Sequence, residues 1–283
     1  MALPFAARAQ RVNDVHSGLN PSQVARIVTP ASGREIQAAI AAAAREKLAV
    51  SIAGGRHAMG GQQFGEGTVL LDMTGLDRVR SFDARRGIVE VEAGITWPPL
   101  IEYLLRAKSA WGIAQKQTGA NRLTIGGAMS ANAHGRGLKM KPFNAYVESF
   151  SLINAEGQRL ICSRQENAEL FRLVHGGYGL FGVVESAALR LVERVKLERV
   201  VEVTDVERFV VAVEKRAAEG FLYGDFQYAI DPASDDFLYK GVFACYRPVA
   251  ASTPVPARQQ ELSDEQWINL IYLAHAHKQR AFD

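Results

Sequence analysis

The chain has 283 residues, of which 48% are hydrophobic and 22% charged, and this composition is that of an ordinary globular protein with one large or two modest domains. The formal net charge is +3 with basic and acidic residues interspersed, so no nucleic-acid partner is expected. No run reaches the roughly 18 apolar residues of a membrane span, and the first eleven residues are too interrupted for a secretory signal. The sequence therefore predicts a cytoplasmic protein.

Few residues suggest metal or disulfide chemistry. The two cysteines, Cys162 and Cys245, are too few for a disulfide framework or a cysteine-rich metal site, and we expect both in the core. His275 and His277 lie two residues apart, which fits surface polar residues better than a metal pair. No metal is expected.

The predicted elements of the first hundred residues alternate between strands and helices. Residues 25–29 form a short strand, Ser32 to Glu35 have the pattern of a capping box, and a helix follows over about 33–47. Further strands are predicted at 48–53, 69–73 and 87–93, and Asp77 and Asp83 mark turns between the last two. Thr96 then caps a helix with an apolar face at Leu100, Ile101, Leu104 and Leu105.

The later elements follow the same alternation. Strands at 149–154 and 159–162 flank a turn, Ser163 to Glu166 predict a second capping box, and its helix stops at Gly176. A strand is expected at 183–192. Beyond residue 194 a helix capped at 204–207 and a strand at 237–246 indicate a second domain.

Glycine is the informative residue, because 15 of the 25 glycines fall within 51–67, 119–137 and 176–182. Such loops need unusual backbone angles or let a ligand approach bare backbone. In the first loop, successive backbone N–H groups from Gly54 onward could form an anion site. In the second, small residues permit a flat aromatic ligand, Thr124 and Ser130 offer hydroxyls, and His134 is either a plain loop histidine or a catalyst.

The third loop, Gly177 to Gly182, matches the dinucleotide-binding pattern G-x-G-x-x-G. That motif requires a strand before it and a helix after it, so that pyrophosphate meets a helix N-terminus. Here the predicted order is helix, loop and strand. The sequence therefore favours a helix cap and tight turn over NAD binding.

Three glycine-rich blocks in order carry a family resemblance: Gly54 to Gln62, Leu123 to Ser130 and Gly179 to Val184. Over roughly residues 20–195 the chain resembles FAD-linked oxidases of the vanillyl-alcohol oxidase superfamily with a PCMH-type FAD-binding domain, such as cytokinin dehydrogenases, sugar-alcohol oxidases and aldonolactone oxidases. The resemblance implies an α+β fold, with an irregular segment at 1–19, a two-subdomain PCMH-type FAD-binding domain at 20–195 and an incomplete α+β substrate domain at 196–283.

The resemblance also implies the contacts of the cofactor FAD. Ala53 to His57 would wrap the pyrophosphate, and His57 occupies the position at which many relatives attach the flavin covalently. Ala58 replaces a common serine, and residues 119–137 contain no cysteine for a second tether. The implied cofactor-binding residues are Ala53, Gly54, Gly55, Arg56, His57, Ala58, Gln62, Gly119, Thr124, Gly127, Ser130, His134 and Val183, the last through its backbone to adenine; His134 is also the candidate catalytic residue.

The implied activity is oxidation of an alcohol or amine, with hydride transfer to flavin N5 and oxygen or another acceptor taking the electrons. A flavin-binding fragment without turnover and an FAD-dependent reductase of the same fold remain alternatives, although His57 favours the oxidase. About 89 residues follow Arg194, fewer than the relatives use for a substrate domain. We therefore expect a truncated substrate domain and a poor catalyst.

Overall fold

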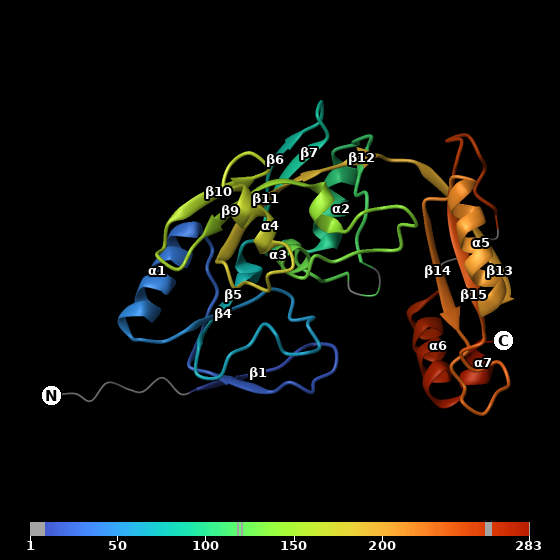
Figure 1. Ribbon diagram of the computed structural model, residues 1–283, viewed down its shortest axis with the longest axis horizontal. Helices are drawn as coiled ribbons and strands as arrows, with labels where there is room; N and C mark the ends of the chain where they lie inside the picture. Colours follow the sequence, from blue (N-terminus) through green and yellow to red (C-terminus); the bar gives the residue numbers. More distant parts are fainter. Residues whose placement is uncertain (1–8, 118, 120, 258–261, 283) are drawn as a thin grey trace. The chain divides into compact units, whose positions relative to one another are not determined.

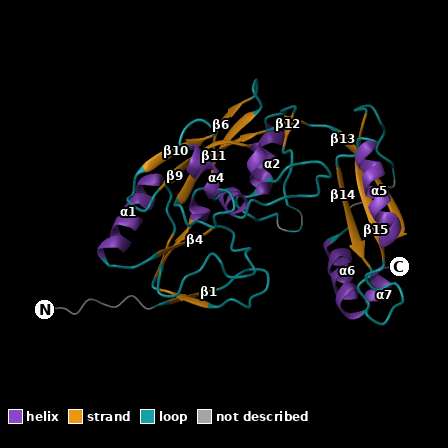
Figure 2. Cartoon of the chain, viewed as in Figure 1, coloured by secondary structure: helices purple, strands orange, loops and turns teal. Residues whose placement is uncertain are grey.

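The computed structural model describes residues 9–117, 119, 121–257 and 262–282 (Figure 1). The chain divides into two compact units: unit 1 consists of Met1–Gly135 and Lys141–Arg194, and unit 2 of Arg136–Met140 and Val195–Asp283. Both units contain helices and strands (Figure 2), which confirms the predicted α+β class. Among the described residues, no helix has the length and apolar character to cross a membrane.

Unit 1 begins with a small parallel sheet in the order β3 (Arg26–Val28), β5 (Val69–Asp72) and β4 (Val50–Ala53). Helix α1 (Gly33–Arg45) connects β3 to β4 and packs Ile36 and Ile40 against Leu71. Its N-terminus is capped as predicted, because the Ser32 side chain accepts from the Glu35 N–H. A short hairpin of β1 (Gln10–Val12) and β2 (Ser22–Val24) precedes it. Strand β1 therefore corrects the expectation that residues 1–19 are irregular, as far as the described residues extend.

The second sheet of unit 1 has five antiparallel strands in the order β10 (Arg159–Ser163), β9 (Val147–Ile153), β11 (Val183–Arg190), β7 (Ile88–Glu92) and β6 (Val79–Asp83). The main core lies on one face of this sheet and includes buried residues of α2 (Trp97–Arg106), α3 (Ile125–Ser130) and α4 (Ala168–Val174). Short pieces complete the unit: β8 (Trp111–Gly112) pairs with β12 (Val192–Glu193), and Met73–Gly75 and Phe143–Tyr146 form 3₁₀ turns.

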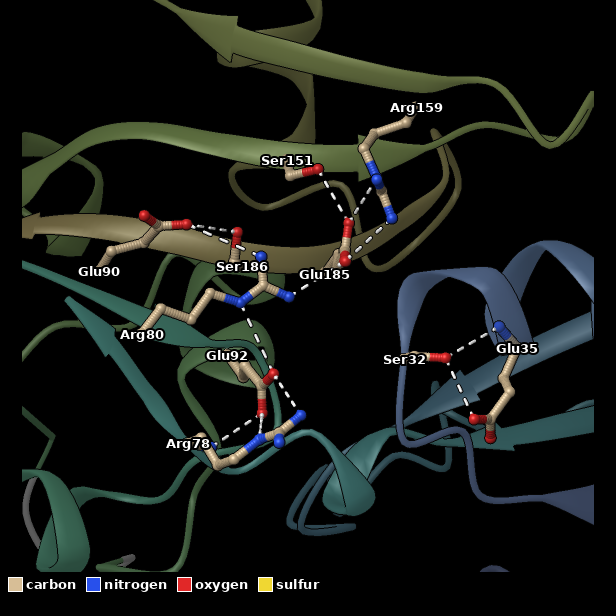
Figure 3. A network of polar contacts seen from close by, with 10 residues as sticks. All are labelled: Ser32, Glu35, Arg78, Arg80, Glu90, Glu92, Ser151, Arg159, Glu185 and Ser186. Atoms are coloured by element: carbon tan, nitrogen blue, oxygen red, sulfur yellow. Dashed lines mark hydrogen bonds and ion pairs between the residues drawn. The ribbon is translucent and has the colours of Figure 1, made fainter.

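The opposite face of the five-stranded sheet contains a network of polar contacts (Figure 3). Glu185 is buried and accepts from Ser151 Oγ at 3.1 Å, and its carboxylate pairs with Arg80 at 3.0 Å and Arg159 at 2.8 Å. The register shifts between Val184 and Ser186, so the bulge places both Glu185 and Ser186 on this face, between the core residues Val184 and Ala187. The ion pairs therefore connect β6, β10 and β11 on the face opposite the main core, where Ile153 and Val183 also pack against α1.

Two predictions in unit 1 are wrong in detail. The region between Asp77 and Asp83, expected to form turns, contains β6, whose side chains pack partly against the core. The second predicted capping box also fails: α4 begins only at Ala168, and Ser163 Oγ accepts from the N–H groups of Gln165 and Glu166 to close a turn after β10. A serine hydroxyl can satisfy either a turn or a helix start, and sequence spacing does not separate them.

Unit 2 is a three-stranded antiparallel sheet in the order β13 (Lys196–Asp205), β15 (Lys240–Val249) and β14 (Tyr223–Tyr228), with helices α5 (Val206–Ala218), α6 (Asp264–Ala276) and α7 (Lys278–Phe282). Its core consists of Phe221, Phe243 and Cys245, against which Phe209 of α5 packs. The segment Arg136–Met140 belongs to this unit, where the Leu138 N–H donates to the Leu222 carbonyl.

The sequence predicted unit 2 less completely than unit 1. Helix α5 was expected, but its cap is Asp205, which accepts from the Arg208 N–H, rather than Thr204. Strand β15 begins at Lys240 instead of residue 237. Strands β13 and β14 and helix α6 were not predicted at all.

Candidate functional site

A cavity of about 200 Å³ lies within unit 1, where three glycine-rich segments meet. The first segment follows β4, the second surrounds α3, and the third connects α4 to β11. The lining residues are Ile52, Gly54, Gly55, Arg56, His57, Ala58, Gln62, Gln63, Met73, Ala93, Leu123, Thr124, Gly126, Gly127, Ser130, Ala131, Tyr178, Gly179, Gly182 and Val184. The fold thus brings together the three blocks that the sequence spreads over residues 54–184.

The first segment approaches the second with bare backbone. A Cβ atom added to Gly54 would collide with Thr124 Oγ1, and one added to Gly55 would collide with the Arg122 carbonyl oxygen. Arg56 follows with a left-handed φ of 55°, which is uncommon outside glycine and turns the chain sharply. The two glycines are therefore required for packing of the loops, and both line the cavity.

The second segment is a short helix rather than the plain loop that the sequence suggested. Thr124 caps α3 by accepting from the Gly127 N–H at 3.2 Å. The N–H of Gly126 donates to the Ala93 carbonyl at 2.7 Å, and an added Cβ at Gly126 would lie 3.1 Å from that oxygen. Gly126 thus allows α3 to lie directly on the backbone that follows β7, and this contact fixes the floor of the cavity.

The third segment is a turn held by backbone hydrogen bonds to α3. The Tyr178 N–H donates to the Ser130 carbonyl at 3.1 Å, and Tyr178, Gly179 and Gly182 all have positive φ. A Cβ at Gly182 would lie 2.6 Å from the Ile153 carbonyl oxygen. The order of α4, loop and β11 is the one predicted. The G-x-G-x-x-G pattern therefore serves a tight turn and close packing here.

His57 is the titratable group of greatest interest in the cavity. Its Nδ1 lies 2.9 Å from Nε2 of His16, the two rings meet edge to face, and the ring also bonds to the Arg122 carbonyl. Burial lowers the pKa of His57, the neighbouring His16 lowers it further, and the bond to Arg122 opposes this shift. The imidazole is therefore neutral near pH 7.

Most of the predicted cofactor-binding residues line this cavity, and four do not. Gly54, Gly55, Arg56, His57, Ala58, Gln62, Thr124, Gly127 and Ser130 line it. Ala53 and Val183 are buried in apolar clusters beside it, so only their backbones are candidates for contact. Gly119 and His134 lie outside the lining, and His134 is exposed with its Nδ1 near the carbonyl of its neighbour Gly135.

Sequence reasoning missed the apolar part of the lining. Ile52, Met73, Ala93 and Leu123 come from strand ends and loops and provide hydrocarbon surface. Leu123 and Gly182 lie in the second and third blocks and Tyr178 directly precedes the third, so the motifs could have identified these three. Among the described residues, no cluster of three or more His, Cys, Asp or Glu side chains is arranged to hold a metal ion.

Comparison with known proteins identifies the cofactor. Residues 24–163 match the model of an FAD binding domain. The chain is 30% identical over 170 residues to the uncharacterized oxidoreductase ORF5 in the fasciation locus of Rhodococcoides fascians, covering 58% of this chain and 37% of that protein. It is 30% identical over 228 residues to cytokinin dehydrogenase 7 of Oryza sativa subsp. japonica, covering 75% and 42%.

One further relative and one solved structure are also similar to this chain. L-gulonolactone oxidase of Bos taurus is 29% identical over 170 residues, covering 60% of this chain and 38% of that protein. The solved structure of an alkyldihydroxyacetonephosphate synthase has the same fold with a TM-score of 0.68 at 17% identity, covering 78% of this chain and 46% of that one. The chain thus spans about two fifths of the length of the curated relatives it matches.

The cavity fits the cofactor that these matches indicate. Its glycine-lined loops leave backbone N–H groups accessible, as binding of a pyrophosphate requires. Its apolar lining suits a flat ring system, and Arg56 adds a positive charge. FAD is therefore the cofactor, and the chain belongs, as its three glycine-rich blocks predict, to the FAD-linked oxidase family of the vanillyl-alcohol oxidase superfamily with a PCMH-type FAD-binding domain.

Proposed function

We propose that the protein is an FAD-dependent oxidoreductase that oxidises an alcohol or an amine. The observation that carries this proposal is the convergence of all three glycine-rich segments on one cavity of unit 1, with His57 in its wall. When bound, FAD supplies the redox chemistry by accepting a hydride at N5. The electrons then pass to oxygen or another acceptor.

The residues of the cavity have separate tasks in this proposal. The backbone N–H groups from Gly54 to His57 bind the pyrophosphate, and the Arg56 guanidinium offsets its charge. Thr124 holds the start of α3 through its cap, so that Gly127 and Ser130 face the cofactor at fixed positions. Ile52, Met73 and Val184 exclude water from the ring system.

We further propose that His57 attaches the flavin covalently. Its ring lines the cavity, its pKa is lowered by burial, and a neutral imidazole has a nitrogen lone pair available for bond formation. His134, the other histidine implied by the family resemblance, is exposed outside this lining. His57 is therefore the better candidate for direct flavin contact.

The experiment begins with the visible spectrum of purified protein, followed by acid precipitation. Flavin colour that stays with the precipitate supports the covalent bond, and His57→Ala should release it into the supernatant. His134→Ala is the matched control and should retain the colour. Free FAD in the supernatant of the wild-type protein would refute the tether and leave FAD binding intact.

Turnover is tested by anaerobic mixing with a panel of polyols, sugars and amines. Bleaching of the flavin by one substrate class, in proportion to the substrate added, supports the proposed oxidation. Bleaching by NADPH alone would indicate a reductase instead. A flavin that no substrate bleaches would indicate a binding protein without turnover.

A further inference from the structure

The loop between β1 and β2, Asn13–Asn20, is ordered around one carboxylate. Asp14 is 4% exposed and accepts from the N–H groups of His16 and Ser17 at 3.1 and 2.6 Å and from Asn20 Nδ2 at 2.9 Å. These hydrogen bonds, that from Asn20 foremost, lower the pKa of the Asp14 carboxyl. The loop therefore keeps one shape without a core of its own.

This loop contacts the glycine-rich segment that follows β4 at three successive places. The Val15 N–H donates to the Arg56 carbonyl at 2.9 Å, and Asn20 Nδ2 donates to the Met59 carbonyl at 2.6 Å. Between them, His16 Nε2 lies 2.9 Å from His57 Nδ1. Residues 13–20 lie outside the matched FAD binding domain, which begins at residue 24. The chain thus adds a support to the cofactor site that the domain match does not include.

The hydrogen bonds of His57 assign its protons. Nδ1 faces His16, whereas Nε2 and the Arg122 carbonyl oxygen both lie next to Gly55. A carbonyl only accepts, so this position favours a proton on Nε2. In the neutral ring Nδ1 is then an acceptor, and His16 Nε2 must donate to it. His16 does not line the cavity itself and so acts through His57.

We infer that His16 is a positioning residue of the flavin site: its Nε2–H donates to His57 Nδ1 and fixes both the tautomer and the ring plane of His57. The inference rests on the proposed function, because its consequence concerns the histidine proposed to meet the flavin. The Asp14-centred loop holds His16 in place, and the bonds at Arg56 and Met59 prevent the two loops from sliding past each other.

The first test measures the His57 tautomer by ¹⁵N NMR of histidine side chains, on protein made by cell-free synthesis without added FAD. Wild type should show His57 protonated at Nε2 only. His16→Ala should shift the ratio of the two tautomers about fivefold, the effect of one lost hydrogen bond. His16→Gln, whose amide N–H can still donate, should restore the wild-type ratio. Leu19→Ala, which changes an exposed residue of the same loop, should have no effect.

An unchanged His57 tautomer in folded His16→Ala would overturn the inference. Circular dichroism and the thermal midpoint of each variant establish that it is folded. If wild type binds no FAD, the proposed function fails, yet this measurement still decides the role of His16 because it contains no flavin.

The second test adds FAD and follows the fraction of flavin that resists acid precipitation. His16→Ala should release the Nδ1 lone pair for bond formation and so speed its appearance about fivefold relative to wild type, again the effect of one hydrogen bond, and His16→Gln should restore the wild-type rate. A purely structural role would slow both variants equally, and this result would overturn the inference. If wild-type flavin is never acid-resistant, the tether is refuted and the NMR result alone decides the inference.

Discussion

The two units of this protein differ in how many buried apolar and charged side chains hold each of them together. Unit 1 buries apolar clusters on two sheets and adds carboxylates such as Glu185 that are buried and paired with arginines. Unit 2 has one small cluster around Phe243, and its helices α5 and α6 contain no buried residue. The glycine-lined cavity proposed to bind FAD is lined by residues of unit 1. We therefore expect cofactor binding to be insensitive to changes in unit 2.

The largest expected effect comes from Phe243→Ala in unit 2. Phe243 is 2% exposed and packs edge to face on Phe209 at a centroid distance of 5.1 Å. Its truncation should cost about 3–5 kcal/mol, as for other buried phenylalanines. Hydrogen exchange should show unit 2 opening, whereas FAD affinity measured by flavin fluorescence should stay at the wild-type value. A parallel loss of FAD affinity would contradict this expectation.

A second prediction concerns the glycine contacts of the cavity. In Gly55→Ala the new Cβ meets the Arg122 carbonyl, and a backbone atom cannot move aside as a flexible side chain can. We expect FAD affinity to fall about 10- to 100-fold, which corresponds to a typical overpacking cost. Titration with FAD measures the loss. Gly112→Ala is the control, because its Cβ would make an ordinary contact of 3.6 Å with Arg194.

The ion pairs of Figure 3 lead to a smaller effect on unit 1. Glu185→Gln removes the charge that pairs with Arg80 and Arg159 but keeps the shape and the acceptor for Ser151. Arg159 is 46% exposed and can regain water, so we expect a loss of about 1–2 kcal/mol, below the cost of breaking a fully buried pair. Urea unfolding measures it. A gain in stability would show that burial of these charges costs more than their pairing returns.

The smallest expected effect is a pH dependence that originates in unit 1. His175 Nδ1 lies 2.6 Å from the Phe171 carbonyl, its Nε2 is buried without a partner, and burial lowers its pKa. A histidine whose folded pKa lies below the unfolded value of about 6.5 makes the folded state bind fewer protons. The free energy of unfolding should therefore fall as pH drops below about 6.5.

His175→Phe keeps an aromatic ring beside Phe150 and Phe171 and removes the titrating group. The decline in unfolding free energy between about pH 7.5 and pH 5 should then be shallower but not absent, because the lowered pKa of His57 acts in the same direction. An identical pH profile in wild type and variant would refute the role of His175.

The sequence predicted unit 1 well because its signals are local. The cap at Ser32 and the turn around residue 157 depend on residues within a few positions, and both are present. Strand β6 was missed because its Asp83 resembles a turn residue, and only pairing with β7 decides the outcome. Strand β13 was missed because its apolar residues do not mark a buried face: Val201 and Val203 are exposed on one side. Only its pairing with β15 decides the outcome.

The glycine-rich residues of the candidate site were predicted from ordered motifs. The residues that pack around them were not. Gly54, Gly55 and Thr124 could be named because a motif fixes their spacing, whereas Ile52 and Met73 enter the cavity through the packing of distant strands. The contact of His16 with His57 spans 41 positions, and no short pattern signals it. His134 lies outside this lining, because adjacency to the second block in sequence does not imply adjacency to the lining.

The assignment of Arg136–Met140 to unit 2 has a consequence for protein synthesis. The chain passes between the units after Gly135, after Met140 and again after Arg194, so neither unit is made in one uninterrupted stretch. Leu138 emerges from the ribosome well before Leu222, whose carbonyl accepts from its N–H. At 5–20 residues per second this interval lasts about 4–17 s. A nascent chain that has released Arg194 but not yet Leu222 from the ribosome would therefore hold a complete cofactor unit in which Leu138 still lacks its Leu222 partner.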